Sequence, residues 1–217
     1  MPSLTRRLAL TLAAGAAIAL AGCKGGGGKA GAAEGEMAMG PANAPVTVYE
    51  YASVTCVHCA AWDRDTWPAF KAKYVDTGQV RYVFREILTP PVAVASAGFL
   101  MARCAGEDRY FDIVHALFRA QEPISQGQSP RDVLVRVAQS AGMTEAQFNA
   151  CVNDEAALEA LNARVERWGA QENVISTPTF VIGDERIEGA APIERFDAVL
   201  QPLLKTRAPA TAGAKAG

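Results

Sequence analysis

The sequence predicts an α/β domain in which an all-helical insertion separates a β-α-β unit from a β-β-α unit. Four runs are rich in β-branched and aromatic residues. Two lie in the first half of the chain, at 46–51 and 80–84, and two near its end, at 179–182 and 186–188. From about residue 92 to residue 173 only helical patterns occur. This segment is much too long to be a loop. We therefore expect one sheet whose strands come from both sides of the insertion.

The β-α-β unit begins with a strand and continues into an amphipathic helix. The strand at 46–51 contains the residue types that favour β structure. Pro68 is placed to kink the following helix, because proline has no N–H to donate. The strand at 80–84 then completes the unit. Helical spacing gathers four aromatic residues onto one side of the helix, namely Trp62, Trp67, Phe70 and Tyr74.

The insertion and the β-β-α unit follow from helix-start signals and a turn. Ser129 and Thr144 have side chains preferred at helix N-caps, and Pro130 fits a first helical turn. The predicted helices of the insertion span 93–104, 109–120, 129–140, 144–151 and 154–171. After the insertion, the two remaining strands turn through Gly183-Asp184. A last helix is expected from 192 to about 205.

Composition is consistent with one globular domain. The chain has 217 residues, of which half are apolar, which is enough for one well-filled core. The formal net charge of −2 gives no basic surface of the kind that binds nucleic acid. We therefore place one domain at 45–205, with its insertion at about 92–173, and expect no nucleic-acid partner.

The N-terminus resembles a bacterial export signal. Arg6-Arg7 precede an apolar run at 8–21 that is too short for a comfortable membrane span and typical of a secretory signal. The paired arginines also resemble a twin-arginine signal, although Ala9 stands where a bulky residue is usual. We assign residues 1–22 to the signal and expect the protein in the bacterial periplasm.

The quartet Leu20-Ala21-Gly22-Cys23 resembles the lipobox of bacterial lipoproteins. That resemblance implies cleavage before Cys23 and lipidation of this cysteine, which would tether the protein to a membrane. Cleavage elsewhere by an ordinary signal peptidase, leaving no anchor, is the alternative. Residues 23–44 are rich in Gly and Ala and are predicted to be a flexible tether. We predict a disordered tail at 206–217.

Cys56-Val57-His58-Cys59 is the motif that indicates chemistry. Two thiols at this spacing can cycle between dithiol and disulfide. The motif lies between a strand and a helix, so Cys56 is expected at a helix N-terminus, where free N–H groups and the helix dipole favour a thiolate. His58, when protonated, adds a positive charge nearby. In such surroundings the pKa of a cysteine falls from about 8.5 to roughly 3.5–7.5.

A structural zinc site uses the same cysteine spacing and is the alternative for this motif. Zinc needs a second pair of ligands, and the chain contains only two histidines, one of them inside the motif. We therefore expect neither a metal nor any other cofactor. The redox-active pair is predicted to be Cys56 and Cys59.

From 45 to 204 the chain resembles the DsbA-like family of thiol-disulfide oxidoreductases, which have a thioredoxin-like fold. Three features carry the resemblance: the Cys-Val-His-Cys motif after a strand, the helical insertion, and Thr177-Pro178-Thr179-Phe180 at the start of the third strand. The resemblance implies a cis Thr177–Pro178 bond that faces the cysteines and helps to bind substrate. It also implies that Glu50 is a buried acid that assists proton movement at Cys59. An ordinary, partly exposed strand glutamate is the alternative.

Two further cysteines and one histidine need separate interpretation. Cys104 and Cys151 both fall at ends of insertion helices, and leftover cysteines in an oxidising compartment tend to pair. Similar cysteines in some DsbA-like proteins form a structural disulfide; two buried free thiols are the alternative. His115 is spaced at helical intervals from Phe111 and Phe118 and is interpreted as a packed helix residue, not a catalytic one.

The resemblance implies a periplasmic enzyme that introduces disulfides into exported proteins. Its substrates would be reduced or unfolded proteins, and a membrane partner, a quinone-linked oxidase or a reductant, would reset the cysteine pair. Val57 and Thr177 depart from the residues common in strong oxidants, which leaves a disulfide reductase or isomerase as an alternative. A non-catalytic lipoprotein that binds unfolded or partner proteins is the other alternative.

Overall fold

The computed structural model of the chain describes residues 35–207. These residues form one five-stranded sheet with the strand order β1-β3-β2-β4-β5. Strands β2 and β3 are parallel, and the other neighbouring pairs are antiparallel. The strands span Met37–Met39 (β1), Val46–Ala52 (β2), Val80–Glu86 (β3), Thr179–Ile182 (β4) and Glu185–Glu188 (β5). The expected split sheet is therefore confirmed.

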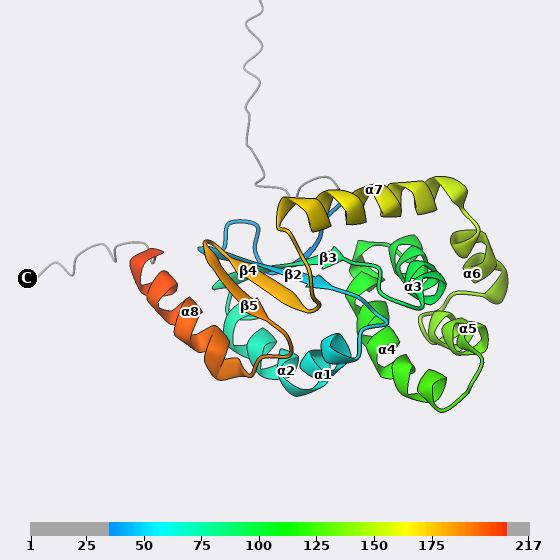
Figure 1. Cartoon of the computed structure of the whole chain (residues 1–217), viewed down its shortest axis with the longest axis horizontal. Coiled ribbons are helices and arrows are strands. Elements are labelled where there is room, and N and C mark those ends of the chain that lie inside the picture. The colour runs from blue at the N-terminus through cyan, green and yellow to red at the C-terminus, as the bar shows by residue number, and fades with distance from the viewer. Residues whose placement is uncertain (1–34, 208–217) are drawn as a thin grey trace, which may run out of the picture.

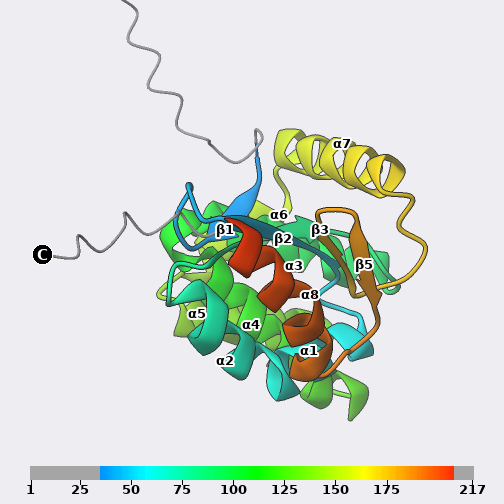
Figure 2. The same cartoon turned by 90° about the vertical axis from the view of Figure 1, so that its left-hand side faces the viewer.

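Helices cover the sheet and build a separate cluster beside it (Figure 1). One side of the sheet carries α1, α2 and α8, while α7 runs along the other (Figures 1 and 2). The helices α3 to α6 pack together at one end of the sheet. The helices span Val57–Asp65 (α1), Trp67–Phe70 (α2), Val92–Cys104 (α3), Glu107–Ser125 (α4), Pro130–Ser140 (α5), Glu145–Val152 (α6), Glu155–Gln171 (α7) and Ile193–Arg207 (α8).

The predicted kink in the first helix is confirmed as a break. Helix α1 ends at Asp65, and α2 begins at Trp67 with Pro68 in its first turn. The chain then continues as a π-helical segment, η1, over Lys71–Val75. Proline is tolerated at this position because the first N–H groups of a helix have no partner inside the helix.

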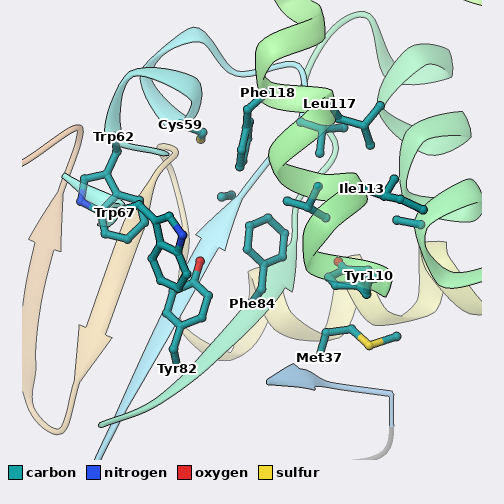
Figure 3. Packing of buried hydrophobic residues seen from close by; sticks show 14 of the residues in the cluster. Met37, Cys59, Trp62, Trp67, Tyr82, Phe84, Tyr110, Ile113, Leu117 and Phe118 are labelled. Carbon is teal, nitrogen blue, oxygen red and sulfur yellow. The ribbon is translucent and has the colours of Figure 1, made fainter. Parts of the chain in front are cut away.

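The aromatic side of α1 and α2 forms the centre of the core. The ring centroids of Trp62 and Phe180 are 4.5 Å apart, and those of Trp67 and Tyr82 are 4.6 Å apart. Figure 3 shows Trp62, Trp67 and Tyr82 side by side, with Phe84 and the α4 side chains next to them. All four aromatic residues predicted to share this side of the helix are buried. This packing fixes α1 on the sheet and thereby fixes the helix that carries Cys59.

The folded domain begins earlier than the sequence predicted. The tether expected at 23–44 overlaps β1, which pairs antiparallel with β3 through Met37 and Phe84. A three-residue strand has too short a pattern to detect, and its position is decided by the free edge of β3. The turn after β1 needs Gly40, whose φ is +83° and whose added Cβ would lie 2.4 Å from the Val80 carbonyl oxygen. The expected tether is wrong for residues 37–39.

The helical insertion is joined to the sheet through a buried carboxylate. Glu86, at the end of β3, is fully buried and pairs with Arg103 of α3 and Arg164 of α7. Tyr110 of α4 also donates a hydrogen bond to this carboxylate, at 3.0 Å. A buried carboxylate needs such partners to offset its desolvation. Three insertion helices are therefore held to one end of β3.

Several other boundaries differ slightly from the prediction. Helix α4 extends to Ser125, whereas its apolar periodicity predicted an end at 120. Helix α8 runs to Arg207, so the first two residues of the expected tail belong to it. The remainder of the tail, the expected signal and Cys23 lie outside the described residues. Among residues 35–207, no helix has the length and apolarity needed to cross a membrane.

Cys104 and Cys151 form a disulfide that links α3 to α6, as the resemblance implied. The Cα atoms of the two residues are 5.9 Å apart, and the bond closes a loop of 47 residues. The alternative of two free thiols is wrong for this structure. Both ends of the bond lie within the insertion, away from the Cys-Val-His-Cys motif.

Removing this disulfide should destabilise the fold. In a Cys104→Ser/Cys151→Ser variant, the free energy of unfolding should fall by up to about 4 kcal/mol, because the unfolded chain regains the entropy that the closed loop removes. Urea unfolding followed by tryptophan fluorescence measures this change. The wild-type protein treated with reductant is the matched control and should unfold like the variant. Equal midpoints for the variant and the oxidised wild type would contradict the prediction.

Candidate active site

The Cys56 loop connects the end of β2 to the start of α1. Cys56 is the N-cap of α1, with φ −84° and ψ 120°. The Cys56 sulfur accepts a hydrogen bond from the Cys59 N–H at 3.3 Å. The backbone N–H of Cys56 donates to the Ser53 carbonyl at 3.0 Å. The predicted position of Cys56 at a helix N-terminus is confirmed. The N-cap geometry directs otherwise unpaired helix donors at the sulfur.

Hydrogen bonding lowers the pKa of Cys56 to about 5. The largest cause is the hydrogen bond with the Cys59 side chain; the Thr177 side chain and the backbone N–H groups of Cys59 and His58 add to it. Desolvation opposes these effects because burial disfavours a charged sulfur. His58 thus acts on the sulfur through its backbone, and its side chain is exposed. The sequence had predicted a contribution from the charge of that side chain.

Cys59 has the opposite environment. Its side chain is 0% exposed, and desolvation raises its pKa well above the usual range, with further contributions from Cys56 and Glu50. Both cysteines are free thiols in this structure, and Cys56 is partly exposed. The two sulfurs are therefore unequal: only Cys56 is open to another protein, and only Cys56 is held as a thiolate near neutral pH.

The loop before β4 faces Cys56 from the other side of the site. The Thr177–Pro178 bond is cis, as the resemblance implied. The Cys56 thiol lies 3.2 Å from the Thr177 carbonyl oxygen, to which it can donate. The Pro178 carbonyl is held by the Gly189 N–H at 2.8 Å. Two segments that are 121 residues apart in the chain therefore meet at one sulfur. A second cis bond, Pro90–Pro91, was not predicted.

Glu50 is buried beneath the cysteine pair. It is 1% exposed, so the alternative of a partly exposed strand residue is wrong. The pKa of Glu50 is raised to about 8, mainly by desolvation; a hydrogen bond from Tyr82 opposes the rise, and the charges of Asp63 and Cys56 add to it. The Tyr82 hydroxyl donates to Oε2 of Glu50, and Oε1 has no partner among the described residues. This arrangement leaves one carboxylate oxygen available for proton exchange.

The insertion contributes contacts that the sequence analysis missed. Gln121 of α4 donates from Nε2 to the Val54 carbonyl at 2.8 Å and to the Cys56 carbonyl at 3.1 Å. These bonds tie α4 to the loop that carries Cys56. No local pattern distinguishes Gln121 from other polar residues of α4. Its role depends on where α4 packs against α1.

His115 and Asp63 form a second contact between α4 and α1. Nδ1 of His115 is paired with Oδ1 of Asp63, and both side chains are largely buried. His115 does not contact either cysteine, which agrees with its interpretation as a packed residue. Asp63 was not among the residues that the sequence singled out. Its position seven residues after Cys56, two helical turns along α1, was a signal that could have been read.

A groove with a volume of about 1190 Å³ runs between α1, α2 and α4. Val57 and Ala60 line it beside Cys56, and Asp63 and His115 line it farther along. Within the described range 35–207, no group of three or more His, Cys, Asp or Glu residues could hold a metal ion. The site therefore consists of two thiols, a cis-proline loop, a buried acid and an open groove.

A family model described as thioredoxin matches residues 32–202. The chain belongs to the thioredoxin family. Its match to the model includes the sheet, the cysteine motif and the helical insertion. This extent agrees with the DsbA-like region at 45–204 that the sequence indicated.

Named relatives and solved structures agree with this membership. The chain is 29% identical over 156 residues to a Rickettsia bellii protein named as a protein-disulfide oxidoreductase. That match covers 71% of this chain and 60% of the relative, so the chain spans little more than half the length of such relatives. The crystal structure of α-DsbA1 from Wolbachia pipientis superposes with a TM-score of 0.74, at 23% identity, over 81% of this chain and 94% of that one. BdbD from Bacillus subtilis gives 0.66, at 22% identity, over 78% and 93%. The chain thus has the DsbA-like form of the thioredoxin fold.

The lowered pKa of Cys56 predicts a titration in the acid range. The absorbance of the reduced protein at 240 nm should rise with pH around a midpoint of about 5, because the thiolate absorbs and the thiol does not. A Cys59→Ala variant should shift this midpoint to higher pH, since it removes the largest stabilising contact of the sulfur. A Cys56→Ser variant should show no step near pH 5 and serves as the control. A wild-type midpoint near 8.5, the value of an ordinary cysteine, would contradict the prediction.

Proposed function

We propose that this protein is a periplasmic thiol-disulfide oxidoreductase that introduces disulfides into exported proteins. The observation that carries the proposal is the inequality of the two thiols in the motif. Hydrogen bonds stabilise the Cys56 thiolate, while burial keeps Cys59 protonated. A pair in this state is stabilised when reduced, so its disulfide is a strong oxidant. The names of the relatives support the same class of reaction.

The reaction exchanges one disulfide between enzyme and substrate. A thiolate of the reduced substrate attacks the Cys56 sulfur, which forms a mixed disulfide and releases Cys59. A second substrate thiolate then attacks the substrate sulfur of this bond and releases the Cys56 thiolate. The substrate gains a disulfide and loses two electrons and two protons, and the enzyme disulfide becomes a dithiol. Attack falls on Cys56 because the Cys59 sulfur is buried.

Glu50 exchanges the proton of Cys59 in this scheme. When Cys59 leaves as a thiolate, it needs a proton that the buried site has to supply. Glu50 is protonated at neutral pH because its pKa is about 8, and its charge acts directly on Cys59. In the reverse direction, when Cys59 attacks Cys56, the Glu50 carboxylate accepts the proton. The orphaned Oε1 is the atom suited to this role.

Apolar side chains around Cys56 support binding of unfolded substrates. Large exposed hydrophobic residues of the described chain occur at three places: Val57 is 68% exposed, Val92 50% and Ile175 80%. Val57 follows Cys56 directly, and Ile175 belongs to the loop that presents the Thr177 carbonyl. Val92 begins the helix after Thr89, whose carbonyl accepts a hydrogen bond from Thr55. Apolar contacts, together with backbone pairing beside Pro178, would bind substrates without demanding one sequence.

The N-terminal sequence supports a location at a bacterial membrane surface. The apolar run and the lipobox-like quartet that ends at Cys23 favour a lipid anchor on Cys23, with the following segment as a tether. A membrane partner linked to quinones would reoxidise the cysteine pair. A membrane reductant would instead fit an enzyme that works as a disulfide reductase or isomerase.

Two measurements test whether the enzyme works as an oxidase: an assay of substrate oxidation and the reduction potential of the cysteine pair. The protein should accelerate oxidative refolding of a reduced two-cysteine substrate. The reduction potential of the Cys56–Cys59 pair should be about −120 mV. A reduction potential of about −270 mV would instead identify a reductant of the thioredoxin type. Cys56→Ser should abolish the activity. If Cys56→Ser retained the cellular phenotype of the wild type, the protein would be a non-catalytic binding module.

Lipidation is tested separately. Cells that express the full chain should incorporate labelled fatty acid into it, and Cys23→Ala should abolish incorporation and release the protein from membranes. Oxidase activity of the Cys23→Ala protein should remain, because the anchor lies outside the redox site. Equal labelling of the two proteins would rule out an anchor at Cys23.

A further inference from the structure

The pair formed by His115 and Asp63 connects the insertion to the active-site helix. His115 lies on α4 and Asp63 on α1, and their contact joins Nδ1 to Oδ1. The Asp63 side chain is largely buried, so its negative charge is poorly hydrated. Among the described residues, His115 is the basic residue that pairs with it. The effect of a buried carboxylate on its neighbours depends on the group that pairs with it.

The pair lies next to the buried proton-exchange group. The Trp67 ring is 5.3 Å from the His115 ring and 4.6 Å from the Tyr82 ring, measured between centroids. Tyr82 in turn donates its hydroxyl hydrogen to Glu50. These residues form a continuous cluster from the groove to the acid beneath Cys59. Asp63 is close enough to Glu50 and Tyr82 for its charge to raise the pKa of both.

The other charged groups around the groove leave the pair isolated. Arg64 is paired with Asp65, and Lys71 with Asp76. Oδ2 of Asp112 lies 3.7 Å from Nε of Arg109. Arg119 and Glu122 also line the groove, and both are exposed on α4. Exposed charges are screened by water and salt, whereas a largely buried charge is screened much less. The charge that acts on Glu50 from this side is therefore that of Asp63, which His115 contacts.

We propose that His115 is a positioning residue that sets the pH range over which Glu50 exchanges the Cys59 proton. The Nδ1 contact of His115 offsets the negative charge of Asp63, so the Glu50 carboxylate forms more easily than it would beside an uncompensated Asp63 carboxylate. Without that contact, the uncompensated Asp63 charge opposes ionisation of Glu50. The inference rests on the proposed function, because it assumes that Glu50 exchanges this proton.

The proposal gives opposite effects for the two members of the pair. Removing His115 leaves the Asp63 charge in place and should move the ionisation of Glu50 to higher pH. Removing the Asp63 charge should move it to lower pH. A purely structural contact between α1 and α4 would instead give changes of the same sign, because either substitution breaks the same contact.

The test measures the step in which Glu50 acts as a base. The full chain is prepared with glutathione bound to Cys56 as a mixed disulfide, and the rate at which Cys59 displaces glutathione is followed from pH 5.5 to 9.5. The wild-type rate should rise with a midpoint near 8, the pKa of Glu50. Glu50→Gln should remove this step. If Glu50→Gln keeps it, both the proton-exchange role of Glu50 and the present proposal are overturned.

His115→Gln should move the midpoint upward by about one pH unit, which slows the reaction about tenfold at pH 7. Asp63→Asn should move it downward, and Asp63→Asn/His115→Gln should match Asp63→Asn alone, since His115 acts only through the Asp63 charge. Arg119→Gln is the matched control, because Arg119 lies one turn from His115 on α4 and lines the same groove. Its profile should equal that of the wild type.

Two results would overturn the proposal while leaving the proposed function intact. One is a His115→Gln profile identical to that of Arg119→Gln. The other is a shift of the same sign in His115→Gln and Asp63→Asn. Thermal unfolding of each variant shows that the measured protein is folded. If His115→Gln does not fold, the sign of the Asp63→Asn shift decides: an upward shift or no shift overturns the proposal.

Discussion

The hydrogen bonds that converge on the Cys56 sulfur are the interaction on which the rest of this site depends. The sulfur occupies the N-cap position of α1 and receives donors from Cys59 and from the backbone of the next turn. A thiolate at this point is stabilised by groups that are already ordered before any substrate arrives. The aromatic packing of α1 on the sheet holds these groups in place.

The chemistry follows from a contrast between two sulfurs that are three residues apart. Hydrogen bonds stabilise the thiolate of Cys56, whereas complete burial destabilises the thiolate of Cys59. Such a pair releases Cys56 readily from a mixed disulfide and needs a proton for Cys59. In the proposed reaction, the buried Glu50 meets this need, because desolvation is the main cause that raises its pKa to about 8. Burial therefore acts twice, on the second thiol and on the acid that serves it.

The helical insertion is part of the active site as well as a cover for the sheet. Gln121 holds the backbone of the Cys56 loop, and His115 holds Asp63 on α1. Both residues come from α4, which the buried Glu86 helps to anchor through Tyr110. The environment of the cysteine pair thus depends on how the insertion packs against α1. A change in that packing would alter the redox site without touching either sulfur.

The sequence by itself determined the order of the strands and helices that follow β1 and the identity of the cysteine pair. Local signals suffice for these features, because periodicity, helix caps and the Cys-Val-His-Cys spacing are all read within a few residues. The resemblance added the cis Thr177–Pro178 bond, the burial of Glu50 and the pairing of Cys104 with Cys151. Tertiary structure alone decided the contacts of His115, Asp63 and Gln121, and the addition of β1 to the sheet edge. These depend on long-range packing, which brings together groups whose local sequence has no distinguishing pattern.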